Sequence, residues 1–135
     1  MKILIIKLSS IGDVVHTLPA LYALRGNYQS AKIDWLVEEE PSNILFGHPL
    51  LNEVFIVKKR GWLKDFRNTY SIAKKIRALN YDMVLDFQGL FKSGLWVFLS
   101  KGKRRIGFDK SRELSHIFLN ERFPAYNPDR HAVDR

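Results

Sequence analysis

The chain alternates between short apolar runs and longer amphipathic segments. Residues 3–6, Ile-Leu-Ile-Ile, form a continuous apolar run rich in β-branched residues, typical of a strand buried on both faces. From Asp13 to about Arg25 the apolar residues recur at helical spacing, and Gly26 closes the segment. Pro19 lies inside it, so either the helix kinks there or its regular part begins at Thr17 as N-cap.

The same alternation continues along the rest of the chain. Further strands are expected at 33–37, 53–57, 83–87 and 105–107, with helices at 42–46, 68–79 and 90–99 and a last strand within 114–123. Strands that alternate with helices of this length imply a parallel sheet with right-handed crossovers. The sequence therefore predicts an α/β fold, a Rossmann-like doubly wound parallel sheet in a three-layer α/β/α domain that fills residues 1–135.

Composition excludes several classes of protein. Of the 135 residues, 46% are hydrophobic and 27% charged, as in a folded soluble domain. The absence of cysteine removes disulfides, thiolate metal sites and cysteine nucleophiles. No apolar run reaches the roughly 18–20 residues of a membrane-spanning helix, and Lys7 interrupts the first run before a signal-peptide core could form. We expect a cytoplasmic protein.

The net charge of +8 is unevenly distributed. Residues 1–57 hold 4 Lys and Arg against 6 Asp and Glu, whereas residues 58–135 hold 18 against 8. This asymmetry indicates an anionic partner, which could be a nucleic acid, a lipid surface or a phosphorylated substrate, although a solvated basic face has the same pattern. Segments 58–64 and 101–112 border strands and supply much of the charge; their candidate anion contacts are Lys58, Arg60, Lys64 and Arg112.

Two unusual loops follow the strands expected to flank the point where strand order reverses, which is where open parallel sheets bind ligands. The first places two hydroxyls, a glycine and a carboxylate at a helix start: Ser9, Ser10, Gly12 and Asp13. Asp13 is either a general base for a substrate hydroxyl or an ordinary N-cap or first-turn aspartate favoured by the helix dipole.

In the second loop, residues 86–94, Gly89 allows close backbone approach to a ligand, and Lys92 with Ser93 lies in the first turn of the next helix. Free backbone N–H groups beside an ammonium group suit an anion, although a lysine at a helix start is also commonly solvated.

Other motifs are missing. Gly12 is the one glycine of the first loop where G-x-G-x-x-G needs three, and no G-x-x-x-x-G-K-[ST] occurs, which disfavours NAD and P-loop chemistry. The four histidines show neither i,i+4 pairing nor an H-E-x-x-H context, so we expect no metal site and no cofactor. The residues leave two function classes: an enzyme with an anionic substrate, or a basic binding module for nucleic acid or an anionic membrane, without catalysis.

Four segments together resemble a known family. Residues 7–21, 86–94, 105–109 and 131–135 are similar to the amino-terminal half of the heptosyltransferase I branch of glycosyltransferase family 9. The most specific stretch is Ser-Ser-x-Gly-Asp-Val-x-His-Thr-Leu-Pro-Ala, and the resemblance spans essentially the whole chain.

The resemblance implies the acceptor-binding half of a two-domain B-type glycosyltransferase, with a donor-binding half after residue 135. It implies inverting transfer of heptose from ADP-heptose to the Kdo sugars of lipid A, without a metal. Asp13 matches the family's proposed catalytic base. The implied partners are the nucleotide-sugar donor and an anionic lipid A-type acceptor, not nucleic acid, and the implied location is the cytoplasmic surface of the inner membrane, to which the protein would be peripheral. The acceptor candidates are Ser9, Ser10, Gly12, Lys58, Arg60, Lys64, Gly89, Lys92 and Arg112.

Overall fold

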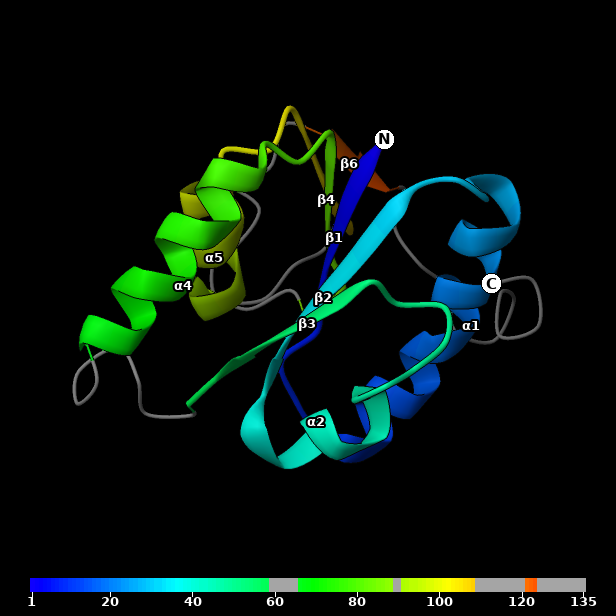
Figure 1. Cartoon of the computed structure of the whole chain (residues 1–135), viewed down its shortest axis with the longest axis horizontal. Coiled ribbons are helices and arrows are strands. Elements are labelled where there is room, and N and C mark those ends of the chain that lie inside the picture. Colours follow the sequence, from blue (N-terminus) through cyan, green and yellow to red (C-terminus); the bar gives the residue numbers. More distant parts are fainter. Residues whose placement is uncertain (59–65, 89–90, 109–120, 124–135) are drawn as a thin grey trace.

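The computed structural model describes residues 1–58, 66–88, 91–108 and 121–123. In this part of the chain six strands form one parallel sheet, in the order β3-β2-β1-β4-β5-β6 (Figure 1). The strands are β1 (Lys2–Ile6), β2 (Lys32–Glu38), β3 (Glu53–Val57), β4 (Met83–Asp86), β5 (Arg104–Phe108) and β6 (Glu121–Phe123). Because β1 pairs with both β2 and β4, strand order reverses between β1 and β4, as predicted.

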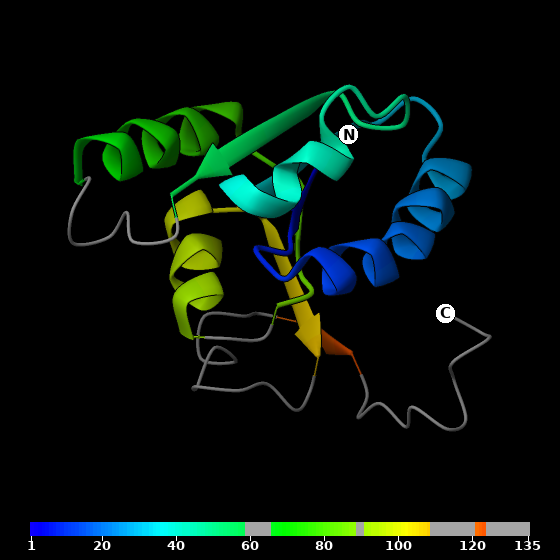
Figure 2. The same cartoon turned by 90° about the horizontal axis from the view of Figure 1, so that it is seen from below.

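Helices cover both faces of the sheet. One face carries α1 (Ile11–Asn27) and α2 (Glu39–Leu45), and the other carries α4 (Phe66–Leu79) and α5 (Phe91–Ser100) (Figures 1 and 2). The predicted doubly wound α/β fold is therefore confirmed. The predicted last strand is represented by β6, and the remainder of that segment, 114–120, lies outside the described residues.

The apolar run of β1 is continuous because both of its faces are buried. Ile3 and Ile5 pack into one core with Val14 of α1, whereas Leu4 and Ile6 pack into the other core, which includes residues of α4 and α5. All four of these apolar side chains are fully buried. Side chains alternate across a strand, so a strand covered on both sides must be apolar at every position.

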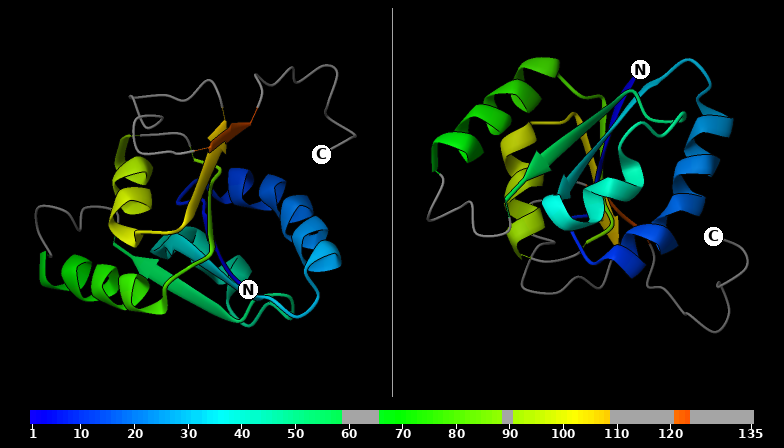
Figure 3. Two further views of the ribbon diagram at one scale, coloured as in Figure 1. Left: turned by 90° about the horizontal axis from the view of Figure 1, so that it is seen from above. Right: turned by 60° about the horizontal axis from the view of Figure 1, so that its bottom comes forward.

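Helix α1 begins at Ile11, before Thr17, which one of the two sequence hypotheses took as its N-cap. Ser10 is its N-cap and Thr17 lies within it, where the Thr17 hydroxyl donates to the backbone carbonyl of Asp13 at 2.8 Å. The hypothesis of a start at Thr17 is therefore wrong, because the first turn is already held at Ser10. Pro19 lies inside the helix, and α1 changes direction along its length (Figures 2 and 3). A proline removes one helical hydrogen bond and accounts for such a bend.

None of the helices within the described ranges has the length and apolar character needed to cross a membrane.

A buried carboxylate interrupts the second core. Asp34 of β2 is fully buried and accepts hydrogen bonds from the Tyr81 hydroxyl at 2.5 Å, while its carboxylate lies 3.3 Å from the Lys32 ammonium group. Burial raises the pKa of Asp34, although Tyr81 and Lys32 both act in the opposite direction. One Asp34 oxygen, Oδ1, has no hydrogen-bond partner among the described residues. The carboxylate therefore depends on few donors.

Replacing Tyr81 by phenylalanine removes one of these donors. We expect Tyr81→Phe to lower the free energy of unfolding by about 1–3 kcal/mol, because it leaves a buried acceptor unsatisfied. Urea unfolding of the two proteins measures the difference. Tyr70→Phe is the matched control, since Tyr70 is 61% exposed on α4, and it should change stability by less than about 0.5 kcal/mol. Equal losses in the two variants would contradict the role given to the Tyr81 hydroxyl.

Candidate functional site

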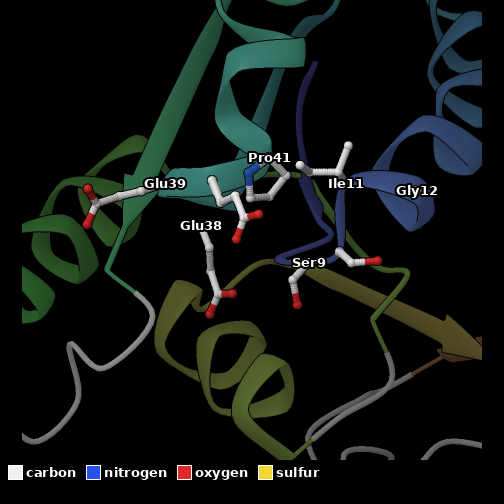
Figure 4. A pocket seen from close by; sticks show the side chains of 8 residues that line it. Ser9, Ile11, Gly12, Glu38, Glu39 and Pro41 are labelled. Atoms are coloured by element: carbon white, nitrogen blue, oxygen red, sulfur yellow. The ribbon is translucent and has the colours of Figure 1, made fainter.

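A cleft of about 520 Å³ opens at the carboxyl ends of β1 and β2. One wall comes from the loop after β1 and the first residues of α1, and the other from the end of β2 and the start of α2 (Figure 4). The lining residues are Ser9, Ser10, Ile11, Gly12, Glu38, Glu39, Glu40 and Pro41. Three of them, Ser9, Ser10 and Gly12, are sequence-predicted site residues. The cleft lies at the edge of the sheet where doubly wound folds bind ligands.

Asp13 directly follows Gly12 in the first turn of α1; it is exposed and is not itself among the residues that line the cleft. Its Oδ2 atom accepts a hydrogen bond from the Ser10 backbone N–H at 3.3 Å and another from the Ser10 hydroxyl at 3.1 Å. A carboxylate that reaches back to the N-cap N–H is one half of a capping box. Asp13 is therefore a first-turn aspartate that contacts the N-cap residue. Its carboxylate is also exposed to solvent.

The capping contacts favour the charged form of Asp13. The Ser10 backbone N–H is the largest cause that lowers the pKa of Asp13 from its usual value of 3.8, and the Ser10 hydroxyl adds to it. Lys7 and His16 also lower this pKa. The site therefore presents an ionised carboxylate at neutral pH, in contact with the Ser10 hydroxyl.

The second predicted loop is held by a buried carboxylate at the end of β4. Asp86 is 2% exposed; its Oδ1 accepts the Gln88 backbone N–H at 2.9 Å and its Oδ2 accepts the Ser93 hydroxyl at 3.2 Å. Ser93 is fully buried, so its hydroxyl serves the internal structure of the loop. The backbone of Lys92 lies in the first turn of α5, as predicted, and Gly89 lies outside the described residues.

The structure places one basic candidate. Lys58 is exposed directly after β3, at the same edge of the sheet, and is not among the residues that line the cleft. Arg60, Lys64 and Arg112 fall outside the described residues, as does the side chain of Lys92.

Sequence analysis did not select three cleft residues, Glu38, Glu39 and Glu40. Glu38 extends to the same side as Ser9, whereas Glu39 extends away from it (Figure 4). The available signal was a run of three carboxylates directly after a buried strand. These side chains have the wrong charge for an anion but can accept hydrogen bonds from hydroxyl groups. This part of the cleft therefore suits a polyhydroxyl ligand.

No group of three or more His, Asp or Glu side chains in the described part of the chain is placed to hold a metal ion. That no metal is required stays a prediction.

Comparison with known proteins identifies the class. Residues 69–135 match the model of glycosyltransferase family 9 (heptosyltransferase). Together with the doubly wound fold and the similarities over the given residues that follow, this match shows that the chain belongs to glycosyltransferase family 9.

Within the family, the chain is similar to lipopolysaccharide heptosyltransferase 1. It is 36% identical to that protein of Pseudomonas aeruginosa over 100% of this chain and 40% of the relative, and 37% identical to that of Escherichia coli K12 over 100% and 45%. It also resembles the structure of E. coli heptosyltransferase WaaC with ADP-2-deoxy-2-fluoro heptose, with a TM-score of 0.85 and 35% identity over 99% of this chain and 45% of WaaC. The chain thus spans less than half the length of these relatives.

The Ser10–Asp13 contact can be tested by titration. Ser10→Ala removes the hydroxyl bond but keeps the backbone N–H, so we expect the pKa of Asp13 to rise while remaining below 3.8. Carbon-detected NMR titration of the Asp13 carboxyl measures it. Ser30→Ala, in the exposed turn before β2, should leave it unchanged. An Asp13 pKa insensitive to Ser10→Ala would mean that the hydroxyl does not contact the carboxylate in solution.

Proposed function

We propose that this chain is the acceptor-side half of an inverting heptosyltransferase of lipopolysaccharide inner-core biosynthesis. In this proposal the enzyme transfers heptose from ADP-heptose to Kdo-lipid A, and a donor-binding half follows residue 135. Similarity to lipopolysaccharide heptosyltransferase 1 over the whole chain supports the reaction class. The WaaC structure with ADP-2-deoxy-2-fluoro heptose supports the donor class.

The observation that carries the proposal is the position of Asp13, an exposed ionised carboxylate in the first turn of the helix after β1, directly following the α1 residues that line the cleft. Asp13 takes the proton of an acceptor hydroxyl as its oxygen forms a bond to the anomeric carbon of the heptose. The bond between that carbon and the phosphate oxygen of ADP breaks on the opposite face, and ADP leaves with the electron pair. Attack opposite to the leaving group inverts the anomeric centre, and positive charge develops on the sugar ring as in glycosidases.

The low pKa of Asp13 is compatible with this role. It keeps the carboxylate deprotonated at neutral pH, and the acceptor hydroxyl becomes a much stronger acid as its bond to the anomeric carbon forms. The proton therefore moves late, when Asp13 is able to accept it. Ser9, Ser10 and Gly12 form the wall of the cleft that faces the acceptor in this proposal.

Charge supports the acceptor assignment. Residues 58–135 hold 18 Lys and Arg against 8 Asp and Glu, which suits the carboxylates of Kdo and the phosphates of lipid A. Since the cleft glutamates cannot bind anions, we assign the anionic contacts to the basic segments and the second loop: Lys58, Arg60, Lys64, Gly89, Lys92 and Arg112. The same cations would attract the protein to an anionic cytoplasmic leaflet, as a peripheral protein of the inner membrane.

The charge asymmetry also favours a second candidate, a basic binding module for nucleic acid or an anionic membrane without catalysis. Such a module would bind its partner irrespective of Asp13. The following two experiments separate the candidates.

In a protein that comprises this chain and the donor-binding half, we expect Asp13→Asn to lower turnover by about 10²–10⁴-fold, the usual effect of a missing general base. The measurement is the rate of heptose transfer to a Kdo-lipid A acceptor, monitored through the release of ADP. If Asp13 were only a capping residue, its loss would cost about 1 kcal/mol of stability and leave turnover intact.

Asp82→Asn is the matched control for this substitution. The Asp82 carboxylate also accepts a backbone N–H, that of Lys2 at 2.9 Å, and its pKa is likewise lowered chiefly by that bond. Asp82 precedes β4, at the sheet edge opposite the cleft, so the variant should retain full turnover. Turnover lost equally in both variants would exclude a specific role for Asp13.

The isolated 135-residue chain should bind an anionic Kdo-lipid A mimic weakly, bind ADP poorly and transfer no sugar. Because the acceptor contacts are between charges, affinity should fall as salt shortens the Debye length from about 10 Å at 0.1 M to about 3 Å at 1 M. Calorimetry with ADP and with the mimic at both salt concentrations tests this. Tight ADP binding without a response to the mimic would assign the chain to the donor side.

A further inference from the structure

The side chain of Gln88 connects the two loops at the switch point. The Oε1 atom of Gln88, just after β4, accepts the backbone N–H of Leu8 at 3.0 Å and that of Ser9 at 3.3 Å. Both donors belong to the loop between β1 and α1, about eighty positions away in the sequence. A single amide oxygen therefore satisfies two backbone donors of the loop that forms one wall of the cleft.

These two donors have no partner within a regular element. Strand β1 ends at Ile6 and α1 begins at Ile11, so the N–H groups of Leu8 and Ser9 are beyond the ladder and before the helix. Backbone donors left without a partner away from water are costly, and Leu8 is 2% exposed. Gln88 satisfies them from the β4 side. From the β2 side, the Glu38 backbone N–H donates to the Leu8 carbonyl at 3.0 Å.

Gln88 is itself held in place. Its backbone N–H donates to the buried carboxylate of Asp86 at 2.9 Å. A contact in the reverse direction ties the same two loops together, because the Lys7 ammonium group donates to the Phe87 carbonyl at 3.2 Å. The turn after β4 is therefore fixed to the loop after β1 by side chains from both loops.

The residue that follows Ser9 is Ser10, whose N–H and hydroxyl hold the Asp13 carboxylate. We propose that Gln88 is a positioning residue for Asp13, acting through the backbone of Leu8 and Ser9. Gln88 does not touch the carboxylate; it fixes the backbone from which Ser10 holds it. Only the purpose of this positioning, proton transfer by Asp13, rests on the proposed function.

The reach and the acceptor of the side chain define three informative variants. Gln88→Met keeps the length and removes the acceptor oxygen. Gln88→Asn keeps the amide and shortens the reach by one methylene. Gln88→Glu keeps the length and supplies acceptor oxygens. Gln29→Met makes the same chemical change as Gln88→Met in the exposed turn after α1 and is the matched control.

Amide hydrogen exchange by NMR on the 135-residue chain is the first readout. In Gln88→Met and Gln88→Asn we expect the Leu8 and Ser9 amides to exchange about tenfold faster or more, while the amides of Ile5 and Leu85 in the sheet keep their rates. Gln88→Glu and Gln29→Met should leave all four amides as in the unsubstituted chain. Unprotected Leu8 and Ser9 amides in the unsubstituted chain would overturn the proposal before any variant is made.

The second readout is turnover in a protein with both halves. Gln88→Met and Gln88→Asn should lower kcat for heptose transfer about tenfold with the KM for ADP-heptose unchanged. Gln88→Glu should keep the kcat of the unsubstituted protein. Full kcat in Gln88→Met, with Asp13→Asn inactive, would overturn the positioning role and leave the proposed function standing. If the Leu8 and Ser9 amides exchange faster in Gln88→Met and Gln88→Asn but Asp13→Asn is fully active, the contact of Gln88 with the backbone stands. The proposed role of Asp13 as base is then overturned.

Discussion

Strand β1 is the constraint on which the rest of the structure depends. It is hydrogen-bonded to β2 on one edge and to β4 on the other, and its residues alternate between two separate cores. A slip of one residue would exchange the two sets of side chains between those cores, so the register of β1 is strongly determined. Chain connections diverge between β1 and β4. The cleft opens on the other side of β1, at the carboxyl ends of β1 and β2, and the loop that leaves β1 forms one of its walls. Asp13 directly follows that wall in the sequence.

Much of this arrangement could be predicted from the sequence because it follows from local patterns. The Ile-Leu-Ile-Ile run identified a strand buried on both faces, and the spacing of later apolar runs gave the alternation of strands and helices. Ser9, Ser10 and Gly12 were correctly placed at the carboxyl edge, since the end of a buried strand must lead there. Local pattern was less informative at the start of α1, where Pro19 and Gly12 weaken the helical signal although Ser10 caps the helix.

The features that were missed depend on contacts distant in sequence. Asp34 occurs within an otherwise apolar strand, and nothing near it indicates that Tyr81 supplies its buried donor, 47 positions later. Glu38 belongs to a run of glutamates, a pattern more often found on a solvated face, yet its side chain is 5% exposed at the cleft. The role of Gln88 is invisible in the sequence, because its partners are backbone groups of Leu8 and Ser9 and carry no residue-type signal.

The bonds between Gln88 and the loop after β1 have a consequence for biosynthesis. Ribosomes add about 5–20 residues per second, so Gln88 is made about 4–16 s after Leu8 and Ser9. Strand β1, α1 and β2 are close in sequence and can associate early, whereas contacts with β4 require closure of a long loop. A nascent chain that has made its first two strands therefore has both serines of the cleft but not the side chain that holds their backbone. The wall of the cleft that holds Ser9 and Ser10 reaches its final shape only when β4 has joined the sheet.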